Sequence, residues 1–87
     1  MKHARKDYQR FQDPLPEYMG GIPPDEPVFL LRAKDITAPG VVRYWALVAK
    51  RAGANDKIIE AALGQAQAMA NWQKEHGSQV PDMPEDA

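Results

Sequence analysis

The sequence PGVVRYWALVAKRAGANDKIIEAALGQAQAMANWQKEHG, residues 39–77, contains two consecutive helical patterns with a short break between them. The first runs from about Pro39 to Ala52, and proline is tolerated in a first turn because its missing N–H would have no helical partner there. Its apolar positions follow the spacing i, i+1, i+4, i+7, i+8, i+11 and are Val41, Val42, Trp45, Val48, Ala49 and Ala52. This spacing predicts an amphipathic helix whose apolar side, including Trp45, faces the core.

The second pattern runs from about Asp56 to His76 and carries a signal at each end. Asn55 is a favourable N-cap, and the carboxylate of Asp56 lies at the positive end of the helix dipole. Gly77 stands where a left-handed C-terminal cap is expected. The apolar stripe of this helix consists of Ile59, Ala62, Leu63, Ala66, Met69 and Ala70.

The break between the two patterns, Gly53-Ala54, is short. A short connection makes consecutive helices antiparallel neighbours, so residues 39–76 are predicted to form a helical hairpin. Gly64 interrupts the second helix at a cost of about 1 kcal/mol relative to alanine. We interpret it as a place where another helix approaches closely, either from this chain or from another copy.

The remainder of the chain contains weaker patterns. Residues 2–12 predict a short N-terminal helix, residues 13–27 a Pro/Gly-rich irregular connector, and residues 78–87 an extended tail. Residues 28–32 are ambiguous: their short apolar run fits a short helix, which we favour, or a buried strand. We therefore expect a mostly α-helical protein with residues 1–87 as a single domain.

Composition excludes several function classes. The chain has 87 residues, no cysteine and two histidines, which excludes disulfides and thiolate chemistry and disfavours a metal centre. Ser78 and His76 are two residues apart in a tail, which does not make a catalytic triad, and no phosphate-binding loop is present. We expect no catalytic residues, no cofactor and no metal. No apolar run approaches a membrane span, so we expect no membrane association and a cytoplasmic location.

The net charge of −1 results from blocks of opposite sign along the chain. Residues 1–12 and 32–51 are basic, whereas residues 13–26 and 75–87 are acidic. Such alternation can produce complementary patches within one copy or between copies. It lacks the basic excess of a general nucleic-acid binder.

Cations interspersed with aromatic rings indicate a different ligand. Arginine and lysine bind phosphate oxygens, aromatic rings stack on bases, and glutamine amides can read a base edge. The alternative is that these are solvated charges and core aromatics. The candidate ligand-binding residues are Arg5, Tyr8, Gln12, Arg32, Lys34, Arg43, Tyr44, Trp72 and Gln73.

Four stretches carry a family resemblance: HARKDY at residues 3–8, QDP at 12–14, DEPVFLLRAKD at 25–35, and Met69 to Asp82 with its Trp72-Gln73 and His76-Gly77-Ser78. Together they resemble a group of small, mostly uncharacterised helical proteins of phages and prophages. The resemblance transfers no catalytic residue. It implies an infected bacterial host and a role against host defence, for which small oligomers that sequester nucleotide-derived immune signals are one pattern.

The sequence thus leads to two hypotheses. The first is a non-enzymatic, homo-oligomeric sponge that sequesters an anionic nucleotide-type signal. The alternative is a protein–protein interaction module that inhibits a host defence protein or assists phage assembly. A chain of 87 residues has little room for a ligand cavity, which favours a site formed with other copies.

Overall fold

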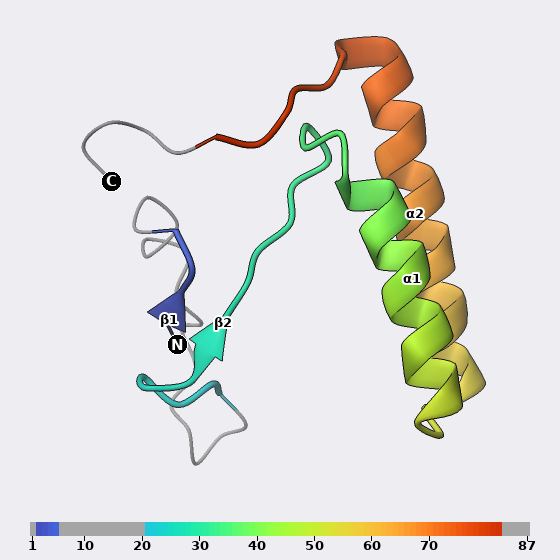
Figure 1. Cartoon of the computed structure of the whole chain (residues 1–87). Coiled ribbons are helices and arrows are strands. Elements are labelled where there is room, and N and C mark those ends of the chain that lie inside the picture. The colour runs from blue at the N-terminus through green and yellow to red at the C-terminus, as the bar shows by residue number, and fades with distance from the viewer. Residues whose placement is uncertain (1, 6–20, 83–87) are drawn as a thin grey trace. The chain divides into compact units, whose positions relative to one another are not determined.

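Two antiparallel helices, α1 (Ala38–Arg51) and α2 (Asp56–His76), form a hairpin in the computed structural model of the chain (Figure 1). The structure describes residues 2–5 and 21–82. The predicted hairpin is confirmed, and both helices begin and end within one residue of the predicted positions.

Local hydrogen bonds explain where each helix begins. The Oδ1 atom of Asn55 accepts a hydrogen bond of 3.0 Å from the N–H of Ile58, which confirms the predicted N-cap of α2. Thr37 precedes α1, and Asp35 Oδ1 accepts from the Thr37 N–H at 2.8 Å and from its hydroxyl at 2.6 Å. Gly53 lies between the helices with φ of +95°, a conformation that glycine adopts without strain.

The core between the helices consists mostly of alanine side chains. Among the described residues, the buried hydrophobic side chains are Ala38, Ala46, Ile59 and Ala66. Trp45 is 49% exposed, so the prediction that it lies in the core is wrong. The side of α1 that faces α2 carries alanines, which allow close approach of the helices, and the larger side chains lie beside that contact.

Gly64 does not mark the contact between α1 and α2. A Cβ atom added at Gly64 would meet no atom within 4 Å. The close approach of a helix from another copy stays a prediction.

Two short strands, β1 (Lys2–His3) and β2 (Pro27–Val28), pair in parallel, with Lys2 opposite Pro27 and His3 opposite Val28. The Ala4 N–H donates to the Val28 carbonyl at 3.2 Å. The favoured helix over residues 28–32 is therefore wrong, and so is the N-terminal helix at residues 2–3; its part at residues 6–12 lies outside the described residues. A four-residue apolar run is too short to form a stable helix on its own.

The chain divides into two compact units, Leu31–Pro81 and the residues up to Leu30 together with those from Asp82. The helical hairpin belongs to the first unit and the strand pair to the second. Of the predicted connector, residues 21–26 are irregular, with a Glu26 N–H to Pro23 carbonyl hydrogen bond of 3.1 Å. Residues 13–20 lie outside the description. In the part of the chain that the structure describes, no helix has an apolar stretch long enough to cross a bilayer.

Candidate functional site

The segments before α1 and after α2 are hydrogen-bonded to each other. The Gln79 N–H donates to the Lys34 carbonyl at 2.8 Å, and the Ile36 N–H donates to the Gln79 carbonyl at 3.0 Å. Asp35 and Gln79 thereby form a parallel bridge. The predicted tail thus begins with a segment that is fixed to the start of the hairpin, while its residues 83–87 lie outside the described part.

Gln73 of α2 reinforces this contact from the helix. Its Nε2 atom donates to the carbonyl oxygens of Ala33 and Asp35, each at 2.8 Å, and the bonds are partly buried. An amide nitrogen has two hydrogens, so one side chain satisfies both carbonyls. The loop that carries Lys34 is thereby held against the last turns of α2.

A pocket of about 250 Å³ lies at this end of the hairpin. Trp72 and His76 are neighbours in it, with ring centroids 4.5 Å apart and ring planes inclined by 33°. The residues that line the pocket are Lys34, Trp72, His76, Gly77, Ser78 and Gln79.

The pocket combines three kinds of binding group. The indole of Trp72 offers a face on which a flat ring can stack, and the Lys34 ammonium can pair with an anion. The imidazole of His76 lies 3.8 Å from the carboxylate of Glu75, and both side chains are more than half exposed. Such an exposed surface contact contributes little and leaves the imidazole accessible to a ligand.

The structure brings together two of the residues that the sequence predicted for binding, Lys34 and Trp72. Gln73 adjoins them but uses its amide nitrogen to hold the Lys34 loop, so its role as a reader of base edges is not supported by this geometry. His76, Gly77, Ser78 and Gln79 also line the pocket and were missing from the predicted set. For His76 the sequence signal was its i, i+4 spacing from Trp72 at the end of a helix.

The other predicted residues are not among those that line the pocket. Arg32, Arg43 and Tyr44 are exposed, Tyr44 by 66%. Arg5 is half-buried and belongs to the unit that contains the strands. Tyr8 and Gln12 lie outside the described residues.

Acidic and histidine side chains do not converge in the described part of the chain, where no group of three could hold a metal ion. No protein-family model matches the chain, and no significant match is found among curated proteins or solved structures. The assignment of function therefore depends on the residues of the hairpin and its pocket.

Proposed function

We propose that this chain is a non-enzymatic binding protein that sequesters an anionic nucleotide-type ligand in the pocket of Lys34, Trp72 and His76. The observation that carries the proposal is the meeting of a cation, an indole and an imidazole at one concave site. A phosphate pairs with the ammonium while a base stacks on the indole, and both groups occur together in a nucleotide.

The size and construction of the pocket support a partial enclosure of such a ligand. Its volume of about 250 Å³ is slightly below the range of roughly 300–1,000 Å³ typical of small-molecule sites. The base, the ribose and one phosphate of a nucleotide therefore fill the pocket, and the rest of a larger ligand extends outside it. The Gln73 hydrogen bonds fix the backbone on both sides of Lys34 before the ligand binds, which lowers the entropy cost of ordering this loop on binding.

The biological role that we propose is that of a phage-type sponge in the cytoplasm of an infected bacterium, which withholds a nucleotide-derived immune signal from its receptor. The support for this role is the sequence resemblance to phage and prophage proteins. Binding without turnover is part of the proposal, because sequestration requires that the ligand stays intact.

Fluorescence titration tests the proposal directly. The chain has two tryptophans, so Trp45→Phe leaves Trp72 as the only indole reporter. Titration of this variant with mononucleotides, cyclic dinucleotides and ADP-ribose is expected to change the emission of Trp72, whereas adenosine, which lacks the phosphate, binds more weakly. Mass spectrometry of the bound compound after incubation is expected to return it unchanged.

Matched lysine variants locate the site. Lys34→Ala is expected to weaken binding at least about tenfold, since a charge-assisted bond is lost. Lys50→Ala removes the same charge from an exposed position that does not line the pocket and is expected to leave the affinity unchanged. Arg43→Ala tests whether the ligand also contacts a residue that the sequence predicted for binding but that does not line the pocket. This variant abolishes binding only if Arg43 contacts the ligand. An absence of any response to the whole ligand panel contradicts the proposal.

The exposed apolar residues of the hairpin favour a second candidate function, a protein–protein interaction module. A protein that covers these residues is expected to bind independently of Lys34. Lys34→Ala therefore distinguishes the two candidates, since it weakens nucleotide binding and leaves protein binding intact.

A further inference from the structure

The two sides of the helical hairpin differ in chemistry. Beyond the first turn of α1, the buried or half-buried residues of the two helices are Val42, Ala46, Ala49, Ile59, Ala62, Ala66, Met69, Ala70 and Gln73. A side chain one position earlier points about 100° around the helix. Because the helices are antiparallel, this rotation leads to the same side of the hairpin on both helices. Of the exposed residues one position before these, those larger than alanine are Val41, Trp45, Val48, Ile58, Gln65 and Trp72.

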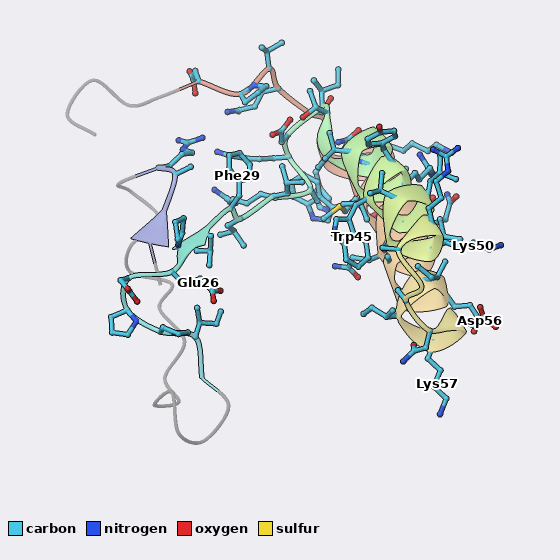
Figure 2. The ribbon with its side chains drawn as sticks, turned by 60° about the horizontal axis from the view of Figure 1, so that its bottom comes forward. Glu26, Phe29, Trp45, Lys50, Asp56 and Lys57 are labelled. Atoms are coloured by element: carbon cyan, nitrogen blue, oxygen red, sulfur yellow. The ribbon has the colours of Figure 1, made fainter. Side chains whose placement is uncertain are left out.

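We call these six residues the apolar side; none of them is charged. The positions that follow the same packed residues form the opposite side, which is mainly polar and charged. Its exposed residues larger than alanine are Arg43, Leu47, Lys50, Glu60, Leu63, Gln67, Asn71 and Lys74. Figure 2 shows Trp45 on one side of the helix pair and Lys50 and Asp56 on the other. The hairpin as a whole is therefore amphipathic.

The large side chains of the apolar side are not covered by the small core between α1 and α2. Trp45 is 49% exposed and Trp72 40%, while the core between the helices is mostly alanine. The aliphatic residues of this side are exposed to the same degree, Val41 by 45%, Val48 by 44% and Ile58 by 46%. The large apolar side chains thus lie outside the contact of α1 with α2, where they can contact another surface.

The exposed area is close to what a specific dimer needs. Two half-exposed tryptophans supply on the order of 200 Å², and the three half-exposed aliphatic residues add roughly 150 Å². A standard interface buries about 800 Å² on each partner, of which roughly two thirds is apolar in homodimers. The apolar side therefore provides most of the apolar part of such an interface.

We propose that a second copy of this chain covers the apolar side, so that two hairpins form a four-helix arrangement. This inference rests on the second candidate function, in which a protein binds this side, and it identifies that protein as a second copy of the chain. An uncharged apolar surface is matched by the same surface of a second copy, with no charge left unpaired and with the charged sides facing water. Gln65 fits the same arrangement, because an amide is both donor and acceptor and can pair with its own equivalent.

The pocket and the apolar side share one residue, Trp72. A second copy on the apolar side consequently borders the pocket and can extend its wall. The two proposals remain separable, since Lys34 lines the pocket and is not part of the apolar side, whereas Val48 is part of that side and does not line the pocket.

Sedimentation equilibrium of the full chain over a wide concentration range tests the inference. The expected result is twice the mass of the chain, with a Tm that rises with protein concentration because folding and association are coupled. Val48→Glu places a carboxylate in the apolar side and is expected to raise the dissociation constant at least about a hundredfold. Leu63→Glu is the matched control: Leu63 is 45% exposed, as Val48 is 44%, but it does not belong to the apolar side, so the dimer is expected to persist.

A monomeric mass at all concentrations with a Tm independent of concentration overturns the inference, whatever the fate of the variants. Acrylamide quenching of the Trp72→Phe variant then shows whether the second candidate function as a whole or only the second copy is excluded. A shielded Trp45 in a monomer means that another part of the same chain covers the apolar side, which also removes the second candidate function. An accessible Trp45 in a monomer leaves that side for a different protein, and only the second copy is excluded.

Discussion

The side chain of Gln73 is bonded to the backbone carbonyl of Asp35, 38 residues earlier in the chain, at 2.8 Å. This bond and its companion to the Ala33 carbonyl connect the end of α2 to the loop before α1. These hydrogen bonds hold together the end of the hairpin where α1 begins and α2 ends, while the turn at Gly53 connects the helices at the other end. The position of Lys34 in the pocket depends on these hydrogen bonds.

Replacement of Gln73 by alanine tests whether its hydrogen bonds hold the loop before α1 against α2. Gln73→Ala removes the Gln73 donor from the partly buried carbonyls of Ala33 and Asp35. The Asp35 carbonyl keeps the Ala38 N–H at 3.0 Å, whereas an unsatisfied buried group at Ala33 costs about 1–3 kcal/mol. We expect the free energy of unfolding, measured in urea, to fall by that amount. Gln67→Ala is the control, because the Gln67 amide donates to the exposed Asn71 side chain at 3.0 Å. Equal effects of the two variants would show that the Gln73 bonds do not hold the loop.

A second prediction concerns the start of α2. Asn55→Ala removes the acceptor of the Ile58 N–H and is expected to lower the free energy of unfolding by about 1 kcal/mol. Asn55→Asp keeps an oxygen at the same place and is expected to retain most of the stability. A loss as large for aspartate as for alanine would contradict the capping role of this oxygen. Urea denaturation monitored by circular dichroism measures both variants.

The hairpin could be predicted from the sequence because its signals are local. The N-cap at Asn55, the glycines after each helix and the apolar spacing each depend on neighbouring residues, and they place the helices within one residue. The strand at Pro27–Val28 could not be predicted because its partner, Lys2–His3, lies far away in the sequence. Strand pairing is a tertiary property, and a two-residue strand leaves almost no periodicity to detect.

The packed side of α1 could not be predicted for a different reason. The apolar stripe of α1 is wide enough for two contacts, and the sequence does not say which contact is made within the hairpin. The structure assigns the alanines to it and leaves Trp45 exposed. At the pocket, Lys34 and Trp72 could be named from their chemistry, but the role of Gln73 follows from backbone carbonyls that a sequence motif does not reveal.

Gly77 provides a third prediction. Its φ of +83° and ψ of +177° lie in a region that is essentially reserved for glycine. Gly77→Ala is expected to lower the free energy of unfolding by about 1–3 kcal/mol and to weaken ligand binding, because residues 77–79 line the pocket. Gly40→Ala is the control, since Gly40 is helical and an added Cβ meets nothing within 4 Å. If Gly77→Ala is as stable as the unmodified chain, the conformation at this position is not the one described.

Gly64 provides the last prediction, which also tests the location of the contact between copies. It lies in the interior of α2, and an added Cβ meets nothing within 4 Å. Gly64→Ala is therefore expected to raise the free energy of unfolding by about 0.5–1 kcal/mol, through the higher helix propensity of alanine. Because Gly64 does not belong to the apolar side, the dissociation constant of the dimer is expected to stay the same. A lower stability together with weaker association would instead show that a helix of the second copy passes close to Gly64, and that the copies meet on a different side of α2.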